Sequence, residues 1–190
     1  ADDETSICLV DADSYGNRIA ESLTQVTDED GAKRCLRRLR HCWMAKLAAA
    51  DILQQVSLKE SLHHYSSFAD AAITKSLQWL FERFVQRHGK PLDANAQLMP
   101  MLVIGMGKLG GKELNFSSDI DLIFAFPEQG ETQGPGRNLE HAVFYKRLAQ
   151  SLIGLLDETT ADGQVFRVDM RLRPFGQSGP LVTSLNALEH

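Results

Sequence analysis

Two aspartates with one residue between them, Asp119 and Asp121, stand at the head of an apolar run that ends at Phe126. If this run is a β-strand, both carboxylates lie on one of its faces, and the side chains of Ile120 and Leu122 lie on the other. Neighbouring carboxylates repel each other unless a cation lies between them. Magnesium prefers hard oxygen ligands and often combines one or two carboxylates with substrate phosphates. The pair therefore predicts a Mg²⁺ site.

A second stretch, residues 164–173, alternates between its two faces and predicts another strand. Its charged face carries an acid among three arginines: Arg167, Asp169, Arg171 and Arg173. If this strand lies beside the first, Asp169 becomes a third metal ligand, and Arg171 and Arg173 can hold phosphate oxygens. Three carboxylates, a pair of Mg²⁺ ions and a basic wall suit in-line attack at a phosphorus atom. The predicted catalytic and metal-binding residues are Asp119, Asp121 and Asp169.

A glycine-rich segment precedes the aspartate pair. Residues 105–110 read Gly-Met-Gly-Lys-Leu-Gly and match the dinucleotide-binding fingerprint. That fingerprint needs a longer helix and then a strand that ends in an acid, whereas here the acids open the strand, so a nicotinamide cofactor is disfavoured. The glycines still let backbone N–H groups approach a phosphate closely. The predicted phosphate- or nucleotide-binding residues are Gly107, Lys108, Gly110, Gly111, Ser118, Arg171 and Arg173.

Residues 1–97 are predicted to form a helical segment, with long amphipathic helices over 30–56 and 66–88. The second helix is expected to end at the glycine and proline of residues 89–91. The polar side of the first helix carries a basic cluster, which we interpret as a solvent-exposed face and not as a nucleic-acid site. Its members are Lys33, Arg34, Arg37, Arg38 and Arg40.

Residues 98–190 are predicted to form the catalytic core. Strands are expected over 98–104, 121–126 and 164–173, a helical turn over 112–115, and a long helix over 138–158. Few strands, mixed with helices and led by a helical segment, predict a small α+β fold with helices on one face of the sheet and the acids on the other. The chain is expected to be a fragment truncated at its C-terminus, with Leu188-Glu189-His190 as a candidate tag remnant.

Composition disfavours several other classes of protein. The 190 residues carry a net charge of −5, which argues against a nucleic-acid-binding protein, and 43% of them are hydrophobic, which is enough for a buried core. The three cysteines lack C-x-x-C spacing, so neither a zinc knuckle nor a disulfide framework is expected. No signal peptide is recognisable, and no apolar run approaches the ~18 residues of a membrane span. A cytoplasmic location away from membranes is expected.

The residues around the acids resemble the polymerase-beta-like nucleotidyltransferase superfamily, whose pattern is a Gly-Ser pair, a spacer, Asp-x-Asp and a later acid on another strand. Here Gly107-Lys108 stands in the Gly-Ser position, ten residues before Asp119, and lysine replaces the serine. Within the superfamily, two segments resemble the glutamine synthetase adenylyltransferase family. They are residues 105–124, GMGKLGGKELNFSSDIDLIF, and residues 168–182, VDMRLRPFGQSGPLV.

The resemblance implies two related catalytic halves on one longer chain. One half attaches AMP to a tyrosine of glutamine synthetase, and the other removes it with phosphate and releases ADP. Residues 115–118 and 173–180 resemble the amino-terminal, adenylyl-removing half. The resemblance therefore implies Mg²⁺-dependent phosphorolysis of adenylylated glutamine synthetase, with a PII signal protein as regulator.

Two alternatives stay open at this point. The same site can attach AMP from ATP to a protein or small-molecule hydroxyl, or the chain can bind a nucleotide or a regulator without turnover. Phosphate is a competent nucleophile near neutral pH, so the phosphorolytic reaction needs no histidine as a general base. The histidines are instead expected at surface or helix-face positions: His63, His64, His88 and His141.

Overall fold

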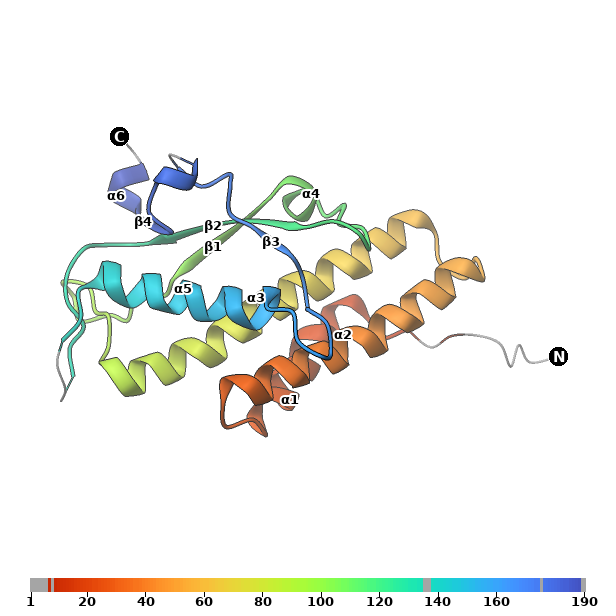
Figure 1. Cartoon of the computed structure of the whole chain (residues 1–190), viewed down its shortest axis with the longest axis horizontal. Coiled ribbons are helices and arrows are strands. Elements are labelled where there is room, and N and C mark those ends of the chain that lie inside the picture. Colours follow the sequence, from red (N-terminus) through yellow and green to blue (C-terminus); the bar gives the residue numbers. More distant parts are fainter. Residues whose placement is uncertain (1–6, 8, 135–137, 175, 189–190) are drawn as a thin grey trace.

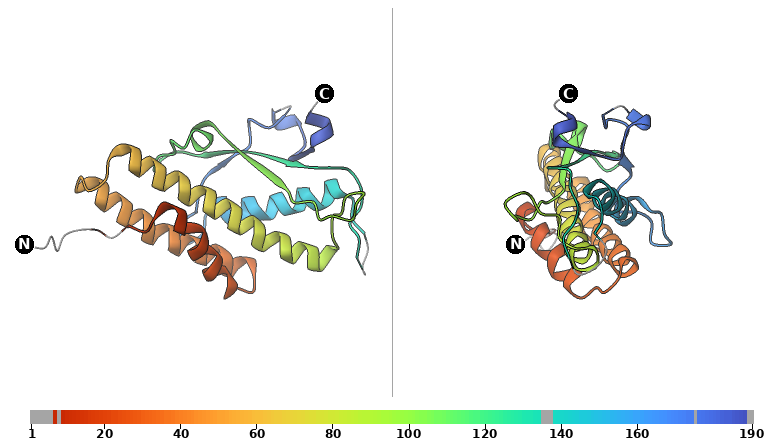
Figure 2. Two further views of the ribbon diagram at one scale, coloured as in Figure 1. Left: turned by 180° about the vertical axis from the view of Figure 1, so that it is seen from behind. Right: turned by 90° about the vertical axis from the view of Figure 1, so that its left-hand side faces the viewer.

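A computed structural model describes residues 7, 9–134, 138–174 and 176–188 of the chain. Three helices come first, α1 (Tyr15–Thr24), α2 (Glu29–Ile52) and α3 (Leu58–His88), and a small mixed sheet with the long helix α5 (His141–Asp157) follows. In Figure 1 the sheet lies over α3 and α5, and α1 and α2 lie beyond α3. Figure 2 shows the same layers from behind and from the side. The predicted α+β class is confirmed.

Capping side chains set the starts of the two long helices. Asp28 accepts a hydrogen bond from the N–H of Gly31 (2.6 Å) at the start of α2. Ser57 and Glu60 form a reciprocal capping box, which starts α3 at residue 58 and not at the predicted 66. α2 ends at Ile52, before the predicted 56, because Gln54 has a φ of 56° and leaves the helical region. A 3₁₀ turn, Ala12–Ser14, precedes α1.

The sheet is built around β2. The strands are β1 (Leu102–Met106), β2 (Ile120–Phe126), β3 (Val168–Asp169) and β4 (Val182–Ser184). β1 pairs with β2 in antiparallel orientation, and β3 and β4 pair in parallel orientation with successive parts of β2. Three short helical segments complete the described elements: α4 (Gly107–Gly110), a 3₁₀ turn (Gly176–Ser178) and α6 (Leu185–Leu188). The candidate tag remnant extends into residues 189–190, which lie outside the described residues.

The strand predicted over 164–173 is much shorter than expected. The backbone N–H groups of Val165 and Phe166 both donate to the carbonyl of Leu156, at 2.9 and 3.0 Å, so this part of the chain binds the end of α5 and not the sheet. On the other side of β3, the carboxylate of Asp169 accepts from the N–H of Arg171 (2.8 Å). Such a local side-chain bond competes with strand pairing, and it turns the chain away after two paired residues.

Other predicted boundaries were also wrong. β1 begins at Leu102 and not at residue 98, because Leu98 instead forms an isolated bridge with Leu92. The helical turn lies at Gly107–Gly110 and not over 112–115, where Lys112 has a φ of 58°. Neither β4 nor α6 was predicted, because their sequences are short and carry no clear periodicity. The long helix predicted over 138–158 is confirmed as α5.

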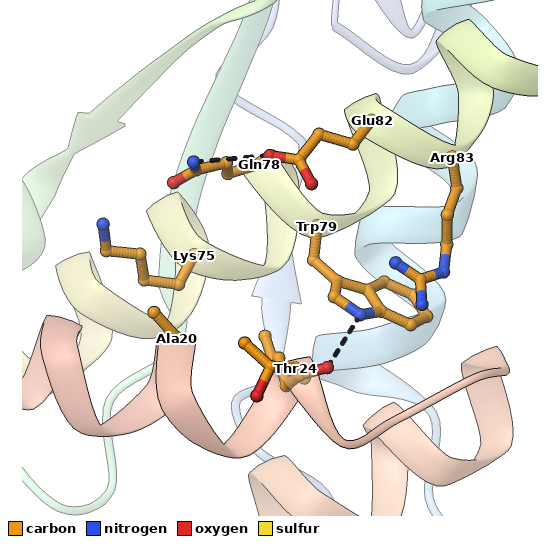
Figure 3. A pocket seen from close by; sticks show the side chains of 8 residues that line it. Ala20, Thr24, Lys75, Gln78, Trp79, Glu82 and Arg83 are labelled. Carbon is orange, nitrogen blue, oxygen red and sulfur yellow. Dashed lines mark hydrogen bonds between the residues drawn. The ribbon is translucent and has the colours of Figure 1, made fainter.

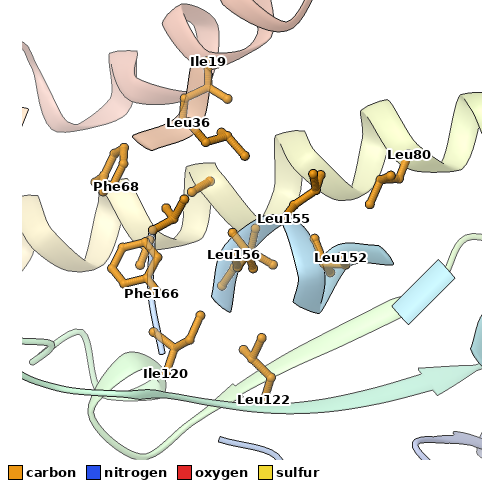
Figure 4. Packing of buried hydrophobic residues seen from close by; sticks show 14 of the residues in the cluster. Ile19, Leu36, Phe68, Leu80, Ile120, Leu122, Leu152, Leu155, Leu156 and Phe166 are labelled. Carbon is orange, nitrogen blue, oxygen red and sulfur yellow. The ribbon is translucent and has the colours of Figure 1, made fainter. Parts of the chain in front are cut away.

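One hydrophobic cluster connects the sheet with the helices. Figure 4 shows Ile120 and Leu122 of β2 facing Leu152 and Leu156 of α5. The same cluster continues to α3, α2 and α1 through further buried side chains: Phe68, Leu36 and Ile19. Residues on both sides of the predicted division at 97/98 therefore share a core, and that division stays a prediction. None of the helices in the described ranges is long and apolar enough to cross a membrane.

Lys33 and Arg40 of the predicted basic face are only partly exposed, and two further basic side chains are buried. Arg37 is fully buried, and Arg34 and Arg38 of the same cluster are exposed as expected. His141 is also buried, at the first residue of α5, where its Nδ1 lies 2.9 Å from the carbonyl of Glu128. Both residues, Arg37 and His141, connect α5 to neighbouring segments. Helical periodicity alone does not reveal these contacts.

Candidate active site

The three predicted acids line one open pocket of about 400 Å³ at the end of the sheet, which we call the carboxylate pocket. Asp121 lies directly opposite Asp169 in the parallel pairing of β2 with β3, and Asp119 immediately precedes β2. Alternation along β2 leaves Ile120 and Leu122 fully buried on the opposite face, as the sequence predicted. Three basic side chains share the pocket with the acids: Lys108, Arg167 and Arg171.

Two arginines pair with two of the acids. Arg171 donates to Asp169 through its Nε (2.7 Å) and its backbone N–H (2.8 Å), which together hold the pKa of that carboxyl below its ordinary value. The Nε of Arg167 lies 2.5 Å from Oδ1 of Asp119, and its Nη2 donates to the carbonyl of Ser117 (2.6 Å). The pocket thus holds acidic and basic groups in close alternation.

A glycine turn forms the wall next to Asp121. Gly107 has a φ of 54°, and a Cβ at this position would lie 2.6 Å from Oδ2 of Asp121. A Cβ at Gly110 would lie 2.6 Å from the carbonyl oxygen of Gly105, so this glycine is required by close backbone packing. α4 has four residues and leads into an antiparallel strand, which is not the long helix and parallel strand of a dinucleotide-binding unit.

Gly107→Ala is expected to lower the free energy of unfolding by about 1–3 kcal/mol and to displace the carboxylate of Asp121, because the new methyl group meets both a left-handed backbone and that carboxylate. Urea unfolding measures the first effect. The matched control is Gly111→Ala, since Gly111 has a negative φ of −79° and the nearest atom to its Cβ would lie 3.6 Å away. Equal losses in the two variants would contradict this account of the turn.

The structure gathers most of the predicted phosphate-binding residues, but not all. Gly107, Lys108, Ser118 and Arg171 line the pocket, and the Nζ of Lys108 donates to Oγ of Ser118 (3.2 Å). The other three do not line it: Gly110, Gly111 and Arg173. Arg173 donates instead to the carbonyl of Met170 (3.0 Å), because the chain turns after β3.

Sequence reasoning left two lining residues out of the predicted site. Arg167 lies on the same alternating face as Asp169, so the pattern contained the signal for it. Ser117 lines the pocket as well, and its backbone N–H and hydroxyl both donate to Oδ1 of Asn115 (3.2 Å each). That local turn leaves no periodic trace in the sequence. Of the residues that the structure describes, no histidine lines this pocket.

The donor set fits Mg²⁺ in its chemistry. Three carboxylates face one pocket, and the buried Oδ1 of Asp119 has no hydrogen bond of normal geometry among the described residues. Within those residues, however, no three His, Cys, Asp or Glu side chains are gathered closely enough to enclose an ion. Arg167 and Arg171, which pair with Asp119 and Asp169, are 57% and 73% exposed, so they can move aside for a cation. The metal-binding role of the acids stays a prediction.

A separate cavity of about 210 Å³ lies between α1 and α3 (Figure 3). Its indole, Trp79, donates to the carbonyl of Leu23 (3.2 Å), and the guanidinium of Arg83 stacks 3.6 Å above the ring. Arg83 also donates to the carbonyl of Val26 (2.7 Å). These bonds connect the two helices, and no acid of the carboxylate pocket contributes to the lining.

The small mixed sheet with helices packed on one face forms a nucleotidyltransferase-like core. The comparison with known sequences narrows this class. The profile of the glutamate-ammonia ligase adenylyltransferase family matches residues 1–190, and the chain belongs to that family. The resemblance to this family is thereby confirmed, and the assignment to one of its two catalytic halves stays a prediction.

Several curated relatives bear the name bifunctional glutamine synthetase adenylyltransferase/adenylyl-removing enzyme. The protein from Idiomarina loihiensis is 92% identical over 186 residues, which are 98% of this chain and 20% of that protein. The protein from Vibrio parahaemolyticus is 51% identical over 176 residues, 93% of this chain and 19% of its own length. The protein from Shewanella oneidensis is 50% identical over 175 residues, which are 92% of this chain and 18% of that protein. The chain thus spans about a fifth of the length of these relatives.

Proposed function

We propose that this chain carries the adenylyl-removing site of its family: phosphate cleaves the bond between AMP and a tyrosine of adenylylated glutamine synthetase, and ADP is released. The names of the relatives include both addition and removal of the adenylyl group. The observation that supports a phosphoryl-transfer site is the register of β2 and β3, which sets Asp121 opposite Asp169 in the pocket that also holds Asp119.

Each group in the pocket has a role in this proposal. Asp119, Asp121 and Asp169 would hold Mg²⁺, which would neutralise phosphate charge and polarise the reacting oxygens. Lys108 and Ser118 contact the phosphoryl group beside the glycine turn. Arg171, which pairs with Asp169, would be free to bind a phosphate oxygen where that carboxylate is used for a cation. The bond from phosphorus to the tyrosine oxygen breaks as a bond to an oxygen of inorganic phosphate forms.

Proton transfer makes few demands on the protein in this reaction. Phosphate is already anionic near neutral pH, and the proton that it carries can pass to the departing tyrosine oxygen, whose ordinary pKa is about 10. The lack of a histidine among the described lining residues is compatible with this route. Regulation by a PII signal protein and a cytoplasmic location belong to the same proposal, since both follow from the family.

One assay separates removal from attachment. The 190-residue chain, and in parallel the whole relative from Idiomarina loihiensis, is incubated with Mg²⁺ and either adenylylated glutamine synthetase plus phosphate or unmodified glutamine synthetase plus ATP. We expect ADP release in the first mixture, and we expect Asp119→Asn and Asp121→Asn to abolish it in both proteins. AMP incorporation by the chain in the second mixture, without ADP release in the first, would favour attachment. Nucleotide binding without either reaction would favour a binding module.

A further inference from the structure

A second pocket adjoins the carboxylate pocket, in which acids and basic groups are mixed, and its own charged side chains are arginines. We call this cavity of about 230 Å³ the arginine pocket, because its lining contains Arg40 and Arg167 and, among the described residues, no acidic side chain. Three residues line both pockets, which places the two cavities side by side: Ser117, Ser118 and Arg167. Pockets that hold drug-sized molecules have volumes of about 300–1,000 Å³, so the arginine pocket suits a small anion better than a whole nucleotide.

Arg40 reaches this pocket from α2 with an unused donor. Its Nε is buried and has no hydrogen-bond partner in the part of the chain that the structure describes. A buried polar group without a partner is costly, so a ligand that accepts from this atom would remove the cost. Arg37, one helical turn earlier, donates to several carbonyls, among them Gly163 (2.7 Å) and Leu155 (3.3 Å). Arg37 therefore fixes the face of α2 from which Arg40 projects.

The rest of the pocket supplies further donors above an apolar floor. Gln164 accepts from the hydroxyl of Thr159 through its Oε1 (3.1 Å), which leaves its amide NH₂ as a donor. Phe166, which belongs to the core shown in Figure 4, and Tyr65 form the floor, with ring centroids 5.7 Å apart. The lining thus combines guanidinium and amide donors, which suit a phosphate-like oxyanion.

From this arrangement we propose that the arginine pocket binds the attacking inorganic phosphate, with Arg40 as its principal ligand and Arg167 shared between this phosphate and Asp119. The inference rests on the proposed phosphorolysis and adds the place from which phosphate attacks. Phosphate held there lies next to the pocket in which the carboxylates would bind the adenylyl group. The inorganic phosphate and the phosphate of the adenylyl group repel each other. With two pockets, each of them is bound by its own cationic groups until they react.

The first test measures binding without catalysis. Inorganic phosphate is titrated calorimetrically into the metal-free 190-residue chain in the presence of a chelator. We expect Arg40→Met to raise the Kd for phosphate by about 10–100-fold, the loss that follows removal of a charged hydrogen-bond donor. The Kd of Arg40→Lys should lie between those of the wild type and Arg40→Met, because lysine keeps the charge and loses the guanidinium fork. Arg38→Met is the control, since Arg38 is exposed on the same helix.

The second test uses steady-state kinetics of the whole relative from Idiomarina loihiensis with the same substitutions at the aligned positions. The KM for phosphate should rise in Arg40→Met, while kcat at saturating phosphate and the KM for adenylylated glutamine synthetase stay near wild type. An unchanged phosphate KM in Arg40→Met and Arg40→Lys would overturn the assignment and leave the proposed function standing. If phosphate binding depended on Arg40 but the enzyme released no ADP, the proposed function would be rejected and the anion site would stand. Arg40→Lys and the melting temperature distinguish a binding defect from a folding defect.

Discussion

Asp169→Asn is expected to lower phosphate-dependent ADP release from adenylylated glutamine synthetase on the order of 10²–10³-fold, as when one preorganised group that stabilises transition-state charge is lost. Asparagine keeps the shape of the side chain, which is 12% exposed, but removes the negative charge opposite Asp121. A divalent cation would then lose one of its hard ligands. The rate of ADP release measures the first effect, and Mn²⁺ binding followed by electron paramagnetic resonance measures the second.

The control for this variant is Asp30→Asn. Asp30 lies in the first turn of α2, its side chain is 78% exposed, and it does not line the pocket. Both activity and Mn²⁺ affinity should stay near wild type in the control. If Asp169→Asn and Asp119→Asn both retained wild-type rates, the metal mechanism would have to be abandoned. Weakened Mn²⁺ binding with an unchanged rate would leave a metal site without a role in the chemistry.

The face on which the acids lie could be predicted because it depends on local alternation. Asp119, Ile120, Asp121 and Leu122 alternate between carboxylate and apolar side chains, and a strand with one buried face must orient them in this way. The alternation beyond residue 164 also placed Asp169 and Arg167 on one face correctly. The predicted length of this strand was wrong, because the carbonyl of Leu156 holds Val165 and Phe166 against α5. That contact joins segments whose pairing no local pattern encodes.

The positions of the arginines show where sequence reasoning stops. Arg37, Arg38 and Arg40 belong to one basic run and are equally polar in the sequence, yet the first is buried, the second exposed and the third half-buried. Their different surroundings come from the segment after α5, which crosses α2 at Gly163 and Gln164. Helical periodicity predicted the face of α2 that contacts the other helices. It contained no information about which loop would cover the opposite side.

Arg37→Met is expected to reduce the free energy of unfolding by about 2–4 kcal/mol, because several buried or partly buried carbonyls lose a charged donor that the methionine cannot replace. The guanidinium donates to Gly163 (2.7 Å), Leu155 (3.3 Å), Lys33 (2.9 Å) and also Glu158, and these bonds tie α2 to the end of α5 and to the turn that follows it. Burial lowers the pKa of this guanidinium, yet it stays charged near neutral pH, since arginine is not deprotonated in proteins. Urea unfolding followed by circular dichroism gives the free-energy difference.

Arg38→Met again serves as the control, and an exposed substitution of this kind should change the stability by less than about 0.5 kcal/mol. If the two variants lost equal stability, the buried bonds of Arg37 would not be what holds α2 in place. The same bonds connect stability with the site, because Arg40 lies one turn beyond Arg37 and faces the segment that leads into β3. Arg37→Met should therefore weaken phosphate binding even under conditions in which the chain stays folded. Arg38→Met should leave it unchanged, so a single pair of variants tests whether the helical segment positions the phosphate pocket.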